Sequence, residues 1–402
     1  MSAQPQLVST NPTGELAVML TGGGARAAYQ VGLLKGLAAA FPRLRFRIVT
    51  GVSAGAINAI YLAAHQGSLK EKSRRLDAMW CELTCDSIYQ FDWKALLPFR
   101  SALASLSPRR NKWTRTRARA LVDTTPLRNL MCRVLDTPPA TPIDGIAENI
   151  RSGELTALAL MTLDYSTGQT VRWVQGRNFR FFEGPHRRSE ITQFTVEHVL
   201  ASAALPFVFP AVRIGNEWHG DGGIRLANPL SPAVQLGATR IIAMSTGYQP
   251  TPDEAATPDI SGYPPAAQIL SQLVNAVFLD AIDEDVTRME RMNELIRAIP
   301  PGQRGGLKPI DLFVLRPSVD LGKLAGDYER YLPRQMKLIV RALGVKETDS
   351  PDFISMLMFE PSFTRRIIDL GEADVTARLA EIRVFLGEDA AHAEREDRRV
   401  AR

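Results

Sequence analysis

The sequence predicts an α/β fold built on a mostly parallel sheet. Two strand–turn–helix units follow one another within the first 65 residues, at 16–40 and 48–64. Further apolar runs typical of buried strands occur at 155–163, 241–244 and 311–315. Strands that alternate with helices form parallel sheets, because each helix carries the chain back to the start of the next strand.

The composition is that of a folded globular chain. Its 402 residues are 45% hydrophobic and 23% charged, which excludes a disordered chain and allows a large core. The net charge of +5 favours anionic partners, and we expect no nucleic-acid partner. Cys81, Cys85 and Cys132 form no Cys-x-x-Cys pair, so they predict reduced, buried thiols in a cytoplasmic protein.

Any contact with a membrane is expected to be peripheral. Residues 1–14 lack the basic and apolar regions of a secretion signal. No apolar run approaches the ~18 residues that span a bilayer.

The first strand, Leu16–Leu20, passes through a glycine loop at 21–26 into a helix that ends at about Ala40. A glycine loop in this place could be a dinucleotide-binding fingerprint. That interpretation requires an acid at the end of the next strand, and residues 42–51 contain none. A Walker loop is excluded because no Gly-Lys-Ser/Thr is present. The loop instead offers unhindered backbone N–H groups at a helix N-terminus, which suits an oxyanion hole.

The second unit contains a Gly-x-Ser-x-Gly pentapeptide at residues 51–55. A strand that turns sharply into a helix leaves no room for a side chain at Gly51 or Gly55, and it pushes Ser53 out at the turn. The helix N-terminus beneath Ser53 favours developing negative charge. Ser53 is therefore a candidate nucleophile, and the alternative is a serine that only caps the helix.

The rest of the chain is predicted to be mainly helical. The expected elements are a polar helical region at 68–140, a hairpin strand at 170–174, a helix at 195–204, a glycine-framed turn at 217–223, a surface loop at 251–264 and a long amphipathic helix at 266–299. We expect a flexible lead-in at 1–14, a catalytic core at 15–245, a helical part at 246–390 that completes the same domain, and a charged tail at 391–402.

A basic segment lies at 109–119. It contains six basic residues and one tryptophan without any acid, namely Arg109, Arg110, Lys112, Trp113, Arg115, Arg117 and Arg119. One interpretation is a solvated loop. The other is a surface that rests on anionic lipid headgroups, to which each charge contributes ~1 kcal/mol.

Ser53 needs a base to act as a nucleophile. In a Ser–Asp–His hydrolase of the α/β type, the acid and then the histidine follow the nucleophile in the sequence. A triad of Ser53, Asp164 and either His198 or His219 therefore remains an alternative. The other histidines are weaker candidates by their predicted positions: His65, His186 and His392. Asp221 is a different candidate, because its flanking glycines allow a close approach to the serine.

Three motifs, taken in order, resemble those of the patatin-like phospholipase family. They are Gly-Gly-Gly-Ala-Arg at 22–26, Gly-Val-Ser-Ala-Gly at 51–55 and Asp-Gly-Gly at 221–223. The segment 201–206 resembles the family's small-residue helix and proline, while Ala27 stands where the family commonly has glycine. The resemblance covers about residues 15–245. It implies a three-layer α/β/α sandwich with a mostly parallel sheet and a largely helical C-terminal part.

The resemblance also implies a catalytic dyad, with Ser53 as the nucleophile and Asp221 as its base. Arg26 would either bind a negative charge of the substrate or support the loop, and no metal or other cofactor is implied. The oxyanion would be held by the backbone amides of Gly22, Gly23, Gly24 and Ala54.

The expected reaction is hydrolysis of acyl esters, above all of phospholipids, through an acyl-enzyme. An acyltransferase or thioesterase with the same dyad is one alternative. A non-catalytic lipid-binding module is another, although none of the three motifs is degraded.

Overall fold

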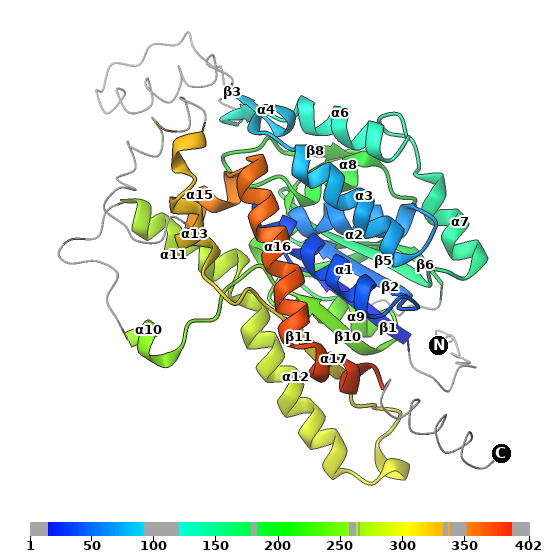
Figure 1. Ribbon diagram of the computed structural model, residues 1–402. Helices are drawn as coiled ribbons and strands as arrows, with labels where there is room; N and C mark the ends of the chain where they lie inside the picture. The colour runs from blue at the N-terminus through cyan, green and yellow to red at the C-terminus, as the bar shows by residue number, and fades with distance from the viewer. Residues whose placement is uncertain are drawn as a thin grey trace, which may run out of the picture.

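The computed structural model describes residues 15–91, 120–177, 183–256, 263, 266–332, 337 and 352–387. A nine-stranded sheet lies at its centre (Figure 1). Its strands are β1 (Glu15–Leu20), β2 (Ile48–Val52), β5 (Ala157–Asp164), β6 (Thr170–Gly176), β7 (Arg187–Ile191), β8 (Val212–Ile214), β9 (Glu217–Asp221), β10 (Ala238–Met244) and β11 (Asp311–Leu315). A separate two-stranded sheet joins β3 (Gln90–Phe91) to β4 (Val122–Asp123).

The strand order is β11-β10-β1-β2-β5-β6-β7, with β9 paired to β5 and β8 paired to β9. The five strands from β11 to β5 are all parallel, whereas β6 and β9 run antiparallel to β5. The expected mostly parallel sheet is confirmed. Because β5 lies beside β2, residues at the end of β9 come close to the end of β2.

Helices cover both faces of the sheet (Figure 1). They are α1 (Ala28–Ala40), α2 (Ala54–Ala64), α3 (Leu69–Glu82), α4 (Cys85–Ile88), α6 (Thr125–Val134), α7 (Asp144–Ser152), α8 (Val196–Ser202), α9 (Ser231–Gln235), α10 (Pro252–Ala256), α11 (Ala266–Phe278), α12 (Ala281–Ala298), α13 (Leu321–Gly326), α15 (Asp352–Leu357), α16 (Pro361–Ala377) and α17 (Leu379–Leu386). Short 3-10 turns occur at η1 (Gly24–Ala27), η2 (Gly222–Arg225), η3 (Pro301–Gln303) and η4 (Glu329–Tyr331).

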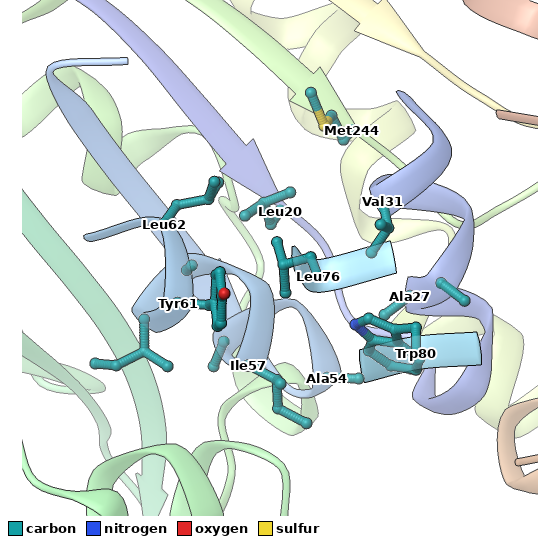
Figure 2. Packing of buried hydrophobic residues seen from close by; sticks show 14 of the residues in the cluster. Leu20, Ala27, Val31, Ala54, Ile57, Tyr61, Leu62, Leu76, Trp80 and Met244 are labelled. Atoms are coloured by element: carbon teal, nitrogen blue, oxygen red, sulfur yellow. The ribbon is translucent and has the colours of Figure 1, made fainter. Parts of the chain in front are cut away.

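The two faces of the sheet have separate apolar cores. The larger core contains side chains of α1, α2, α3 and α16, and Figure 2 shows Ala54, Ile57 and Tyr61 of α2 near Trp80 of α3. The smaller core joins α9 and α12 to the other face. A strand that is covered on both faces requires a continuous apolar run. The strands β1, β2 and β5 are mainly apolar and almost entirely buried, as this requires. The predicted three-layer α/β/α fold is therefore confirmed.

The backbones of α1 and α16 touch through two glycines. A Cβ atom at Gly32 would lie 2.0 Å from the carbonyl oxygen of Ile368, and one at Gly371 would lie 2.5 Å from that of Tyr29. The Tyr29 hydroxyl also donates a hydrogen bond to Asp374 Oδ2 at 2.8 Å. A helix from the end of the chain thus packs directly on the first helix.

Two predicted elements are wrong in detail. Residues 217–221 form strand β9 rather than a glycine-framed turn, because they pair with β5 on one side and β8 on the other. The helix predicted over 266–299 is two helices, α11 and α12, which end and begin around Leu279. Leu279 is buried at this break, and α12 then places Ile282 in the smaller core, so packing interrupts a continuous apolar pattern.

Smaller differences concern the loop at 251–264 and the cysteines. Residues 252–256 of that predicted loop form α10. All three cysteines are free thiols, but only Cys85 is buried, because Cys81 and Cys132 lie on helix positions that are partly open to solvent. The strands β7 and β8 have no counterpart among the predicted elements.

Three predicted segments lie outside the described residues: the lead-in 1–14, the basic segment 109–119 and the tail 391–402. Among the helices of the described ranges, none has both the length and the apolar character needed to cross a membrane.

Candidate active site

Ser53 occupies the sharp turn between β2 and α2. Its φ of 55° lies in the left-handed region, which is a strained conformation for a residue with a side chain. A Cβ at Gly51 would lie 2.6 Å from Ala59 Cβ, and one at Gly55 would lie 2.3 Å from the carbonyl oxygen of Thr21. Both glycines are therefore required by the close approach of β1, β2 and α2.

The backbone of Ser53 is held in this conformation from α8. The Ser53 N–H donates a hydrogen bond to Ser202 Oγ at 3.0 Å, and the side chain of Ser202 is fully buried. Sequence reasoning missed this contact, although Ser202 lies in the segment 201–206 that carries part of the family resemblance. The contact satisfies a buried donor at the strained residue.

Asp221 ends β9 and lies against Ser53. Ser53 Oγ donates a hydrogen bond to Asp221 Oδ2 at 2.6 Å, and the Gly223 N–H donates to Oδ1 at 2.8 Å. The Asp221 N–H itself donates to the carbonyl oxygen of Ala204 at 3.1 Å. Both carboxylate oxygens and the backbone of Asp221 are thus fixed, and the residue is fully buried.

Burial changes the acidity of this carboxyl group. It raises the pKa of Asp221 to about 7, while the hydrogen bonds from Ser53 and Gly223 act in the opposite direction. A pKa near neutrality is the value at which a carboxylate works best as a general base, because it both accepts and releases a proton readily.

The glycine loop after β1 lies beside Ser53. A Cβ at Gly22 would lie 2.8 Å from Ser53 Cβ, and Gly23 and Gly24 have φ values of 137° and 57°. The Thr246 hydroxyl, two residues after β10, donates a hydrogen bond to the carbonyl oxygen of Gly22. Across the described ranges, the N–H groups of Gly22 and Gly23 donate to no other group of the protein. Both are therefore free backbone donors within the described residues.

Arg26 lies in a buried polar cluster with α15. Its side chain forms an ion pair with Asp352, and its Nε donates a hydrogen bond to Ser355 Oγ at 2.5 Å. Asn275 of α11 donates to the other oxygen of Asp352 at 2.7 Å. Only 2% of Arg26 is exposed, so the guanidinium is enclosed by protein groups. No feature of the sequence signalled Asp352 or Ser355 as partners.

An apolar pocket opens beside Ser53. Apart from Ser53, its lining consists of glycine, alanine and large apolar side chains: Gly24, Ala54, Ile57, Met79, Trp80, Leu83, Ile88, Leu127, Leu130, Met131, Ala203, Leu205, Phe209, Met356, Leu357 and Phe359. The walls of the pocket are therefore apolar, and the hydroxyl of Ser53 is the polar side-chain group among its lining residues.

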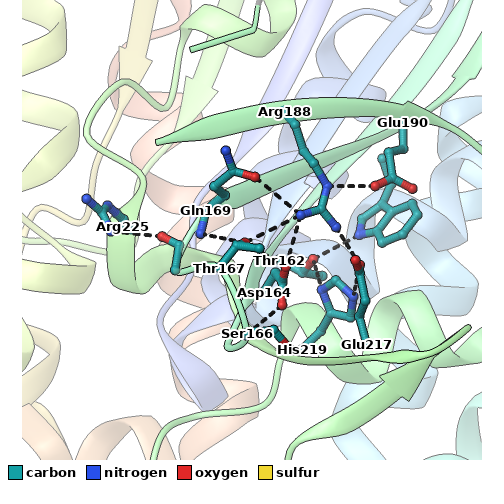
Figure 3. A network of polar contacts seen from close by, with 12 residues as sticks. Thr162, Asp164, Ser166, Thr167, Gln169, Arg188, Glu190, Glu217, His219 and Arg225 are labelled. Carbon is teal, nitrogen blue, oxygen red and sulfur yellow. Dashed lines mark hydrogen bonds and ion pairs between the residues drawn. The ribbon is translucent and has the colours of Figure 1, made fainter. Parts of the chain in front are cut away.

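The structure gives Asp164 a different role from that of a triad acid. Figure 3 shows its carboxylate accepting hydrogen bonds from the Ser166 N–H, the Thr167 hydroxyl and Arg188. Despite the opposing effect of burial, these hydrogen bonds hold the pKa of Asp164 well below its usual range. Arg188 also bonds Glu190 and Glu217, so Asp164 belongs to an ion-pair network that joins β5, β7 and β9.

The described histidines are engaged elsewhere. His219 Nδ1 lies 3.1 Å from Thr162 Oγ1, and its Nε2 lies 3.5 Å from Glu217 Oε2. Figure 3 shows His219 between these two residues. His198 Nδ1 accepts a hydrogen bond from the Thr195 N–H. Burial lowers the pKa of His198 to about 4. Burial also holds the pKa of His219 below its usual value. Among His65, His186, His198 and His219, none forms a hydrogen bond to Ser53 or Asp221. Within the described residues, no conventional triad is assembled around Ser53.

A metal site is likewise not assembled in the part of the chain that the structure describes. No three His, Cys, Asp or Glu side chains there lie in an arrangement that could hold a metal ion.

A serine at a strand-to-helix turn of a parallel α/β sheet, beside a glycine loop, is an arrangement typical of serine hydrolases. The chain belongs to the patatin-like phospholipase family, whose sequence model, described as Patatin-like phospholipase, matches residues 18–234, more than half of the chain.

Three solved structures illustrate what this chain is similar to. Human GIVD cytosolic phospholipase A2, in complex with methyl gamma-linolenyl fluorophosphonate and terbium chloride, has 13% identity and a TM-score of 0.41. VipD from Legionella pneumophila has 12% identity and a TM-score of 0.32, and the type III effector ExoU has 15% and 0.33.

These matches span most of the present chain but only part of each neighbour. The aligned regions cover 94%, 89% and 97% of this chain, and 60%, 67% and 63% of the human enzyme, VipD and ExoU. This chain thus spans about three fifths of the length of the human enzyme. No curated protein sequence matches the chain.

Proposed function

We propose that the chain hydrolyses acyl esters of phospholipids through a dyad of Ser53 and Asp221. The observation that carries this proposal is the 2.6 Å hydrogen bond from Ser53 Oγ to the buried Asp221 carboxylate. Asp221 is the only carboxylate among the described residues that bonds the serine, and its pKa of about 7 suits a base.

The reaction then proceeds in two halves. Ser53 Oγ attacks the acyl carbon while its proton passes to Asp221 Oδ2, and the C–O bond to the alcohol breaks as that proton moves to the leaving oxygen. Water attacks the acyl-enzyme next and gives its proton to Asp221. The bond to Ser53 Oγ breaks, Ser53 regains the proton, and the fatty acid leaves.

The tetrahedral intermediates carry a negative oxygen in both halves. The amides of Gly22, Gly23 and Gly24, with that of Ala54 at the start of α2, are the donors we assign to it. Gly22 lies against Ser53, and the N–H groups of Gly22 and Gly23 have no acceptor among the described residues. Removing one such donor typically costs ~3–4 kcal/mol of transition-state stabilisation.

We infer that Arg26 supports the loop rather than binding the substrate. Its buried ion pair with Asp352 leaves the guanidinium enclosed, and Ser355 occupies its Nε. Arg26 follows Gly24 by two residues, so fixing it to α15 also fixes the end of the glycine loop.

The apolar pocket supports a lipid as the substrate, because a long acyl chain would fill the space between Ile57, Trp80 and Phe359 while its ester group meets Ser53.

We further propose that residues 15–390 form one domain and that the protein is cytoplasmic. Peripheral contact with anionic membranes through the segment 109–119 is a further proposal.

A fluorophosphonate probe tests the nucleophile. It should label the wild-type chain and fail on Ser53→Ala, whereas labelling that persists in Ser53→Ala would contradict the assignment. Incubation with mixed phospholipid vesicles should release free fatty acid from the wild type alone. Adding a soluble alcohol or thiol would divert the acyl group only if the enzyme is a transferase.

A further inference from the structure

Phe207 combines two features that both cost free energy. Its φ of 65° lies in the left-handed region, which is a genuine outlier for a bulky residue. Its side chain is also 84% exposed, so an apolar ring stands in water. Of the described non-glycine residues with positive φ, Phe207 is the only aromatic one.

The neighbouring backbone holds Phe207 in this conformation. The Leu121 N–H donates a hydrogen bond to the carbonyl oxygen of Phe207 at 3.2 Å, and the Val122 N–H donates to that of Val208 at 3.2 Å. Within the turn, the Phe209 N–H donates to the carbonyl oxygen of Leu205 at 2.9 Å. Strain that persists under such constraints points to a function for the side chain it displays.

The position of Phe207 indicates which function this is. Leu205 and Phe209 flank it in the turn, and both line the apolar pocket beside Ser53. The buried Val208, in contrast, packs into the larger core. The side chains of Leu205 and Phe209 therefore point into the protein, whereas that of Phe207 points into solvent beside the apolar pocket.

We propose that Phe207 inserts into the lipid surface from which the enzyme takes its substrate, and this proposal rests on the proposed function. A lipid must leave its bilayer with its acyl chain in an apolar environment throughout. An aromatic ring fixed outward beside the pocket would anchor the protein in the acyl region and shorten that path. Aromatic side chains supply a large apolar area at a low cost in side-chain entropy.

The variant Phe207→Gly separates this role from a structural one. Glycine adopts a φ of 65° without strain, so Tm should equal or exceed that of the wild type. Sedimentation with uncharged phosphatidylcholine vesicles at high salt should weaken about tenfold, since transfer of a Phe side chain out of water is worth a factor of at least this order. Fatty-acid release from the vesicles should fall in parallel, and Phe207→Trp should retain both.

Two controls accompany it. A short-chain ester in free solution should be hydrolysed by Phe207→Gly within about twofold of the wild-type rate, because the dyad and the pocket are intact. Val384→Ser removes another exposed apolar side chain, 70% exposed, on α17, which lies far from α6 and α8 in Figure 1. It should leave vesicle binding unchanged.

Vesicle binding by Phe207→Gly at the wild-type level would overturn the proposal. So would a parallel loss of Tm, vesicle activity and soluble-ester activity, since that pattern belongs to a structural residue. A wild type that binds vesicles through Phe207 but hydrolyses neither ester would refute the proposed function and leave the lipid contact standing.

Discussion

The groups assigned to the chemistry come from one part of the chain, whereas two parts of the chain shape the space around them. Ser53, Asp221 and the glycine loop all lie within the family-matched region 18–234. The region after α11 holds none of these groups, but it supplies Met356, Leu357 and Phe359 to the pocket, and Asp352 to Arg26. The candidate reactive groups follow from short local motifs, whereas part of the cavity wall comes from a segment that is remote in the sequence.

The two regions meet most closely at the glycine loop. A Cβ at Gly24 would lie 2.0 Å from the carbonyl oxygen of Met356, so the loop is shaped by α15 as much as by β1. A chain with the same motifs but a different α15 would keep the chemistry and change the loop. The following experiments test how far the first region depends on the second.

The largest effect is expected from the first region alone. Asp221→Asn keeps the shape of the side chain and removes the base, so kcat should fall by about 10⁴-fold, as for loss of a partner of a catalytic serine.

In the wild type, kcat/KM should drop about tenfold per pH unit below 7, because protonated Asp221 accepts no proton. His219→Ala should retain most activity, and a loss equal to that of Ser53→Ala would exclude the dyad.

The variant Asp221→Asn should also change the thermal stability of the protein. The pKa of Asp221 is raised in the folded protein, so the folded state is penalised as pH rises from about 4 to about 7 and the buried carboxyl ionises. Asn carries no such penalty. The Tm of Asp221→Asn should therefore exceed that of the wild type at pH 8, and the difference should shrink at pH 5.

The next effect is expected at the contact between the regions. Gly24→Ala places a Cβ against Met356 at a φ of 57°, which must shift the loop and should lower kcat by about 10²-fold, as removal of an oxyanion donor does. Gly215→Ala is a matched control, because Gly215 has a φ of 59° with nothing within 4 Å of the new Cβ. Equal kcat in both variants would mean that the loop tolerates movement.

A third effect is expected from the C-terminal region. Asp352→Asn leaves the charge of Arg26 buried without its partner carboxylate, which typically costs ~3–5 kcal/mol of unfolding free energy. The loop should also loosen and kcat should fall more than KM changes. Glu381→Gln breaks the exposed pair with Arg378 and should cost ~0.5 kcal/mol or less. Full activity of Asp352→Asn would assign Arg26 to another role.

The smallest effect is expected from the segment 109–119. Neutralising Arg115, Arg117 and Arg119 should weaken binding to anionic vesicles at low salt only, because screening shortens charge attraction to ~8 Å at physiological ionic strength. Hydrolysis of a soluble ester should be unchanged. Identical sedimentation of variant and wild type at low salt would favour a solvated loop.

The mostly parallel sheet and the sharp turn at Ser53 could be predicted from the sequence because each depends on a few neighbouring positions. The turn of Ser53 needs Gly51 and Gly55, which are close in the sequence. The support of the site by Ser202 and Asp352 depends on packing across 149 and 326 positions, and no local pattern signals it. We predicted a turn where strand β9 lies, because the glycines on both sides of Asp221 are typical of a turn.

The glycine contact between α1 and α16 has a consequence for biosynthesis. Gly32 leaves the ribosome long before Gly371, and at ~5–20 residues per second the interval is on the order of tens of seconds. Throughout that time the face of α1 that α16 will cover is exposed to the cell. A chaperone that shields the nascent chain would therefore matter more for the yield of this protein than for its final stability.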